Sequence, residues 1–118
     1  TTQARGCLFV ENEASYGGAI LTWNSAAWLL NCTFVSNTSS LGGALYAHDR
    51  SPVVIANTIM WGDSQPEIYN GNSTVWIANS TIANSGGSGG SWNTGYGTDL
   101  GGNLDSDPNF LKQSDPYG

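Results

Sequence analysis

Two copies of one motif, 25 residues apart, place the strongest constraint on how this chain can fold. The first copy reads CLFVENEASYGGAI and starts at Cys7, and the second reads CTFVSNTSSLGGAL and starts at Cys32. Weaker third and fourth copies, VIANTIM and IANSTIA, place Ile59 and Ile82 at the position of Phe34. Repeats of about 20 to 50 residues are typical of solenoids, in which each unit buries its apolar face against its neighbours. The chain is therefore predicted to be a solenoid.

Low charge and short apolar runs decide which kind of solenoid is predicted. Charged residues make up only 10% of the chain, which also contains 16 glycines, whereas helical repeats need leucine and charged residues at a helical period. The apolar runs are rich in β-branched and aromatic residues and are bounded by Gly, Asn, Ser or Pro, as strands between turns are. The spaced leucines of a leucine-rich repeat fit none of the copies. The sequence predicts an all-β, right-handed parallel β-helix of about four to five coils, each of about 23 to 25 residues.

Equivalent residues of successive coils stack on one another in a parallel β-helix, so the repeats predict columns of side chains. The inward apolar column is predicted to consist of Phe9, Phe34, Ile59 and Ile82. Alternation along the strands predicts a second inward column of Cys7, Cys32, Asn57 and Ser80. It also predicts an outward column of Leu8, Thr33, Thr58 and Thr81.

The five tryptophans divide by the same alternation. Trp28 and Trp76 share the parity of the inward columns and are predicted to lie in the core. Trp23, Trp61 and Trp92 are candidates for exposure, where they could form a surface that stacks on sugars.

Two kinds of corner are predicted between the strands. Asn12 and Asn37 fall where a strand should bend, and the amide of each is expected to bond to the amide of the next coil. The pairs Gly17-Gly18 and Gly42-Gly43 predict a second, tighter corner. These repeated residues are therefore explained by architecture, without a catalytic role.

The combination of F-x-x-N with G-G-A and an aliphatic residue resembles the repeat pair of the polymorphic outer-membrane proteins and of other secreted bacterial β-helix proteins. Both elements occur twice, beginning at Phe9 and Gly17 and again at Phe34 and Gly42. The segment GGNLDSDPNF, with NTIMWGD before it, is similar to the end of β-helix domains in large anchored proteins, where D-P-x-F marks the exit from the last coil. The resemblance implies an extracellular or bacterial cell-surface location. It implies no activity, because adhesins and polysaccharide-cleaving enzymes share this scaffold.

Charge excludes several classes of partner. The net charge is -6, and the three basic residues, Arg5, Arg50 and Lys112, are too few to neutralise a nucleic acid backbone. No apolar run approaches the length of about 18 residues that a membrane span needs. The chain starts TTQARG, without Met or a signal peptide, so a mature product or an excised piece is expected.

The residues with reactive side chains have structural interpretations as well. Cys7 and Cys32 would stack at about 4.8 Å, which allows either a disulfide or a ladder of reduced thiols. His48, beside Asp49 and Arg50, suggests acid-base chemistry, but no supported nucleophile can be assigned to it, and a charged turn is predicted. No enzymatic activity is expected.

Four aspartates gather in the last part of the sequence and suggest a calcium site. Oxygen-rich loops hold calcium with about six to eight ligands, although the spacing here matches no EF-hand, and solvated turns are the alternative. Apart from calcium, no cofactor is expected. The candidate ligands are Asp99, Asp105, Asp107 and Asp115.

A single domain with three parts is predicted. Residues 1–84 form the coils, residues 85–102 form a Gly/Ser-rich excursion from the last coil or a linker, and residues 103–118 form the exit segment. Neither end carries an evident capping helix, so the ends are expected to contact other copies, as in a filament, or neighbouring coils of a longer chain. The alternative is that the excursion and DPNFL fold back as a C-terminal cap.

The predicted function is an extracellular structural or adhesive module. The alternative from another class is a carbohydrate-binding module or a non-catalytic fragment of a polysaccharide-acting β-helix enzyme.

Overall fold

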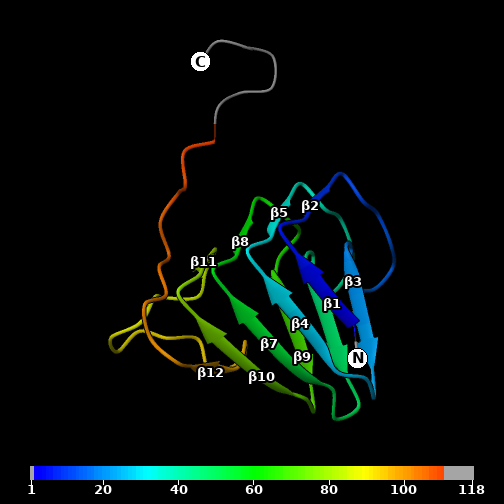
Figure 1. The fold of residues 1–118 in the computed structure, drawn as a ribbon. Coiled ribbons are helices and arrows are strands. Elements are labelled where there is room, and N and C mark those ends of the chain that lie inside the picture. Colours follow the sequence, from blue (N-terminus) through cyan, green and yellow to red (C-terminus); the bar gives the residue numbers. More distant parts are fainter. Residues whose placement is uncertain (1, 111–118) are drawn as a thin grey trace.

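The computed structural model describes residues 2–110, which form a parallel β-solenoid of about four turns (Figure 1). This confirms the predicted fold class. The described residues contain no helix, and hence no helix that could span a membrane. Lys112 and Asp115 lie outside the described residues.

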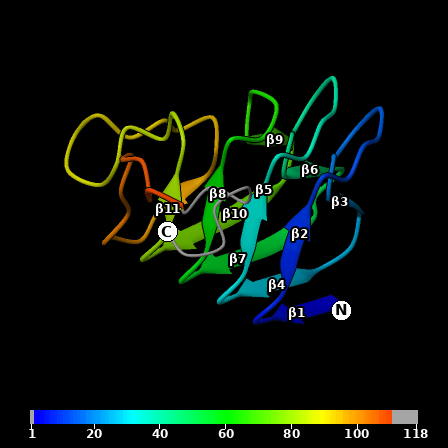
Figure 2. The same cartoon turned by 90° about the horizontal axis from the view of Figure 1, so that it is seen from above.

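Each coil supplies one strand to each of up to three parallel sheets, which Figure 2 shows as separate rows. The first sheet, β1-β4-β7-β10-β12, consists of Thr2–Arg5, Ala27–Leu30, Pro52–Ala56, Thr74–Ala78 and Thr98–Asp99. The second, β2-β5-β8-β11, consists of Leu8–Val10, Thr33–Val35, Ile59–Trp61 and Thr81–Ile82. The third, β3-β6-β9, consists of Ile20–Trp23, Leu45–His48 and Ile68–Gly71.

The core is a stack of inward side chains, as expected for a solenoid that buries each coil against the next. The rings of Phe9 and Phe34 stack with centroids 4.6 Å apart and planes 6° from parallel. The fully buried side chains of the strands in the later coils include Leu29, Ile55, Met60, Ile77 and Ile82.

The third coil is displaced by one residue from the predicted register. Phe34 pairs with Met60, and Thr33 pairs with Ile59. The prediction that Ile59 lies in the inward column is therefore wrong: Met60 is fully buried there, while Ile59 lies half-buried on the outer face. Ile82 pairs with Met60 and is buried, in the column where it was predicted.

The extra residue enters at the turn after β6. Trp23 pairs with His48 at the original spacing of 25 residues, but Ala27 pairs with Val53, a spacing of 26. Both residues of the intervening turn, Asp49 and Arg50, have positive φ, 55° and 61°, whereas the turn of the first coil has one such residue, Asn24. One added residue thus shifts the strands that follow by one position.

A column of asparagines at the corner between the first two sheets changes the direction of the side chains around it. Asn31, Asn57 and Asn79 have φ of 56°, 50° and 50°, a left-handed conformation that asparagine tolerates better than most residues. A corner residue of this kind interrupts the period-2 alternation. The inward placement of Asn57 and the outward placement of Thr58 are accordingly wrong, because Thr58 is buried and donates its hydroxyl to the carbonyl of Ala56.

The two tryptophans predicted to be core residues lie on the outer face for the same reason. If side chains alternated without interruption across Asn31, Trp28 would point inward. Trp28 is instead 43% exposed, while its neighbours Ala27 and Leu29 are buried. Trp76 is half-buried between two buried neighbours, Val75 and Ile77.

The glycine pairs form close corners. Gly42 has φ of 69°, and a Cβ on Gly43 would collide with the backbone of Ser64 in the next coil. Only glycine at these positions lets the coils approach to this extent.

Residues 85–97, here named the capping segment, leave the last coil and fold back against the core. Tyr96 in this segment is buried within the core cluster, and Trp92 packs against the cluster. The hydroxyl of Tyr96 donates to the carbonyl of Ala83 at 3.0 Å. The chain then returns as β12, which pairs with β10. The capping segment therefore covers the core at the C-terminal end of the solenoid.

Candidate functional site

The N-terminal end of the solenoid is an open edge. The strands β1, β2 and β3 make up the first coil, and each is the terminal strand of its sheet, with one neighbour among the strands of residues 2–110. Alternate residues of a parallel strand direct their N–H and C=O groups to opposite sides, so about half of these groups in each strand face away from the solenoid. Figure 2 shows β1 at the end of its row, next to β4.

Side chains of the first coil are more exposed than their equivalents one coil later. Leu21 is 47% exposed, whereas Tyr46, its partner in β6, is 9% exposed. Leu8 reaches 65%, and Phe9 is half-buried although its partner Phe34 is fully buried. The first coil thus lacks cover in all three sheets.

Two aromatic rings mark this edge. The indole of Trp23 stacks on the imidazole of His48 at 4.5 Å, and Phe9 stacks on Phe34, so each ring has one covered face. Trp23 remains 58% exposed. Because stacked rings in this solenoid lie along its axis, the second faces of Phe9 and Trp23 are suited to stack on a preceding coil.

The asparagine ladder continues into a buried carboxyl pair. Asn12 donates its side-chain amide to Oδ1 of Asn37 at 2.9 Å, and Asn37 donates its own to Oδ1 of Asp63 at 2.7 Å. Asp63 in turn donates its backbone N–H to Oε2 of Glu67 at 3.2 Å. The second sheet reaches the third after fewer residues here than in the preceding coil, which brings Asp63 and Glu67 together. Asn37, Asp63 and Glu67 are all buried.

The surroundings of Glu67 favour its protonated form. Oδ2 of Asp63 and Oε1 of Glu67 are buried without a hydrogen-bond donor among the described residues, and a proton on Glu67 supplies the donor that they lack. Burial, followed by the hydrogen bond to Asp63 and the charge of Asp63, raises the pKa of Glu67 to about 10. Tyr96, whose hydroxyl accepts from the backbone N–H of Glu67 at 3.3 Å, is the other titratable group facing the pair, and burial raises its pKa to about 12. Glu67 is therefore neutral in the folded protein at neutral pH.

The aspartates predicted to bind calcium are held by the chain's own donors. Oδ1 of Asp99 accepts hydrogen bonds from Ser88, Gly101 and Asn103. Asp105 accepts from two backbone N–H groups, and Asp107 accepts from one. Between residues 2 and 110, no three His, Cys, Asp or Glu side chains come close enough together to hold a metal ion. The structure does not bring Asp99, Asp105 and Asp107 into one site.

Both cysteines are free thiols in adjacent coils. Cys32 is buried, and its S–H has the carbonyls of Ala4 and Leu30 as acceptors, each at 3.3 Å. Cys7 is exposed at the open edge and donates to the carbonyl of Arg5.

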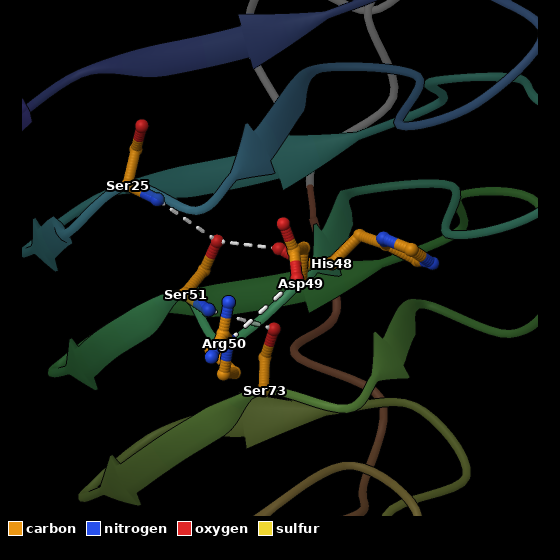
Figure 3. A network of polar contacts seen from close by, with 6 residues as sticks. All are labelled: Ser25, His48, Asp49, Arg50, Ser51 and Ser73. Carbon is orange, nitrogen blue, oxygen red and sulfur yellow. Dashed lines mark hydrogen bonds and ion pairs between the residues drawn. The ribbon is translucent and has the colours of Figure 1, made fainter.

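The turn that contains His48, Asp49 and Arg50 is built around a ladder of serines (Figure 3). Ser51 is buried, accepts from the backbone N–H of Ser25 at 3.2 Å and donates its own N–H to Ser73 at 3.0 Å. Its hydroxyl donates to the carbonyl oxygen of His48, and in Figure 3 the imidazole points away from the serines. Ser51 and the imidazole of His48 therefore do not form a nucleophile-base pair.

Comparisons with protein family models, with curated proteins and with solved structures found no match for this chain. The fold and the open edge are thus the observations on which a function can be argued.

Proposed function

We propose that the chain is a structural module of an extracellular β-helix, and that its open N-terminal edge pairs with a further coil of parallel β-helix. The observation that carries the proposal is that, within residues 2–110, all three sheets end at the first coil in a strand that is paired on one side only. The proposal includes membership of the polymorphic outer-membrane or secreted bacterial β-helix group, whose F-x-x-N and G-G-A elements the chain resembles. An unpaired β edge is a template for another strand, so a module of this kind stacks along the solenoid axis.

A further coil fits this edge better than a second copy of the chain does. The strand pairs β1/β4, β2/β5 and β3/β6 all keep one spacing of 25 residues, so a preceding coil of equal length would pair in three sheets at once. It would also cover the free ring faces of Phe9 and Trp23. An end-to-end filament would need an open C-terminal end, where the capping segment and β12 lie, so the proposal is restricted to the N-terminal edge.

Adding a coil is expected to stabilise the protein. A second copy of residues 2–26 placed directly before Thr2 continues the register, because Thr2 pairs with Ala27 one coil later. Stability in a solenoid is roughly a sum of coil and interface contributions, so we expect the free energy of unfolding to rise by about 2 kcal/mol or more. Urea unfolding followed by tryptophan fluorescence measures this change.

The matched control is the same added coil with aspartate at the positions equivalent to Phe9 and Trp23, which should give little or no gain. Equal stability of the two extended proteins, or no gain in either, would contradict the proposed pairing. So would a stable dimer of the original chain in sedimentation across a concentration series, because the occupant would then be a second copy.

We also propose that the module is not an enzyme. The net charge of -6 disfavours acidic polysaccharides, and the acidic side chains of residues 2–110 form no cluster of three. The purified chain is expected to release neither unsaturated nor reducing ends from pectin or alginate. Release that disappears on His48→Ala would overturn this.

A further inference from the structure

A groove with a mixed polar and apolar lining lies at the C-terminal end of the solenoid, far along the axis from the open edge. Its volume is about 530 Å³, within the range of small-ligand sites. Strands β9, β10 and β12 and the residues near them form one wall, and the capping segment forms the other. The residues that line it with side chains able to bind a ligand are Asn70, Ser73, Trp92, Thr94, Thr98 and Asp99.

We propose that this groove binds an uncharged saccharide, with Trp92 as the stacking surface and Asp99 as the acceptor of sugar hydroxyls. The proposal is independent of the pairing at the N-terminal edge, because it concerns the opposite end of the molecule.

Trp92 is held in place as an apolar wall. Its indole N–H donates to the carbonyl of Gly97 at 2.9 Å, and the ring packs against the core cluster. Gly97 itself lies against β10, where a Cβ would collide with Val75. Tyr96, which precedes Gly97 in the sequence, is buried in the core cluster and anchors the same stretch of chain. An aromatic ring fixed in this way offers its surface to the C–H face of a sugar ring without a large loss of conformational entropy.

Hydrogen bonds to one carboxylate oxygen hold Asp99 in place, and its other oxygen is available to a ligand. Oδ1 accepts from Oγ of Ser88 at 2.6 Å, from the N–H of Gly101 at 2.9 Å and from the amide of Asn103 at 2.8 Å. These bonds, that of Ser88 foremost, lower the pKa of Asp99, so its carboxylate is ionised at neutral pH. No donor among the described residues bonds to Oδ2, which can accept charge-assisted hydrogen bonds from sugar hydroxyls.

The chemistry of the lining selects against charged ligands. The groove contains one carboxylate and no lysine or arginine among its described residues, so an anionic sugar would meet repulsion without compensation. The other polar groups of the groove are the hydroxyls of Thr94 and Thr98 and the side-chain amide of Asn70. Each of these groups can both donate and accept hydrogen bonds. A hydroxyl-rich, uncharged ligand satisfies all of these groups.

The test uses the whole chain labelled with ¹⁵N and titrated with maltohexaose, cellohexaose and mannohexaose, with an oligogalacturonate as the charged comparison. We expect at least one neutral oligosaccharide to shift the Trp92 indole N–H and the amides of Thr94 and Thr98, and the oligogalacturonate to shift none. Asp99→Asn, which keeps an acceptor at Oδ1 but loses the charge, should weaken binding about tenfold.

Glu13→Gln, which removes an exposed carboxylate at the other end of the solenoid, is the matched control for Asp99→Asn and should leave the affinity unchanged. Trp92→Ala could disturb the capping segment, so Thr94→Val serves as a second variant and should also weaken binding. The proposal is overturned if no neutral oligosaccharide shifts Trp92, if the charged sugar binds as well, or if Asp99→Asn and Thr94→Val both bind like the original protein.

Discussion

Replacing Glu67 by glutamine is expected to make the protein more stable at pH 8, by about 2 to 4 kcal/mol, and to leave it nearly unchanged near pH 4.5. A glutamine amide can donate to Oδ2 of Asp63, as the protonated carboxyl group of Glu67 can, and it never ionises. Substituting a fully buried residue usually destabilises a protein, so a gain that appears only as the pH rises is a specific result.

The direction of this change in stability with pH follows from the proton that folded Glu67 retains. Unfolded glutamate ionises near 4.5, whereas folded Glu67 keeps its proton to about pH 10. The contribution of the protonated pair to stability is therefore complete below about pH 4.5 and is lost progressively up to about pH 10, by at most about 1.4 kcal/mol per pH unit. Urea unfolding at several pH values measures the slope for the original protein and for Glu67→Gln.

The control for this experiment is Glu13→Gln, which removes a carboxylate from an exposed position of the first coil. It should leave the pH dependence of the original protein in place. If Glu67→Gln keeps the original slope, or is less stable at every pH, Glu67 does not carry a proton in the folded protein at neutral pH.

Replacing Asn37 by alanine is expected to cost about 3 kcal/mol or more in the free energy of unfolding. Its side chain accepts from the backbone and the side chain of Asn12, and donates to the carbonyl of Phe9 and to Asp63. Removing it leaves the N–H of Asn12 and the carbonyl of Phe9 without these partners, and leaves Oδ1 of Asp63 with one donor fewer. Thermal and urea unfolding both measure the loss.

Asn12→Ala is the matched control, because Asn12 is the exposed end of the same ladder. It should cost less than about 1 kcal/mol, since Oδ1 of Asn37 keeps its bond from the backbone N–H of Asn12. Similar costs for the two substitutions would show that burial of the ladder contributes little.

The sequence predicted the ladder of Asn12 and Asn37 but not its continuation to Asp63. The reason is the single residue added at the turn after β6. A spacing of 25 places Gly62 after Asn37, whereas the added residue at the turn of Asp49 and Arg50 places Asp63 there. The carboxyl pair was missed in consequence.

A better signal for the register was present in two columns of polar residues. Ser25, Ser51 and Ser73 and the corner asparagines Asn31, Asn57 and Asn79 both follow spacings of 26 and 22, which fix the third and fourth coils. The wrong inward placement of Trp28 and Trp76 has a different origin, because it comes from the corner asparagines, which interrupt the alternation. The capping segment and its groove could not be predicted, because a Gly-rich stretch without periodicity does not indicate which residue, here Tyr96, enters the core.

Amide hydrogen exchange at the first coil tests the open edge most directly. In the isolated chain at low concentration, the outward-facing amides of β1, β2 and β3 should exchange rapidly, and their equivalents in β4, β5 and β6 slowly. After a copy of residues 2–26 is added before Thr2, those same amides should become protected. Slow exchange of these amides in the isolated chain, or no protection after the coil is added, would contradict the proposal that this edge is built to pair with another coil.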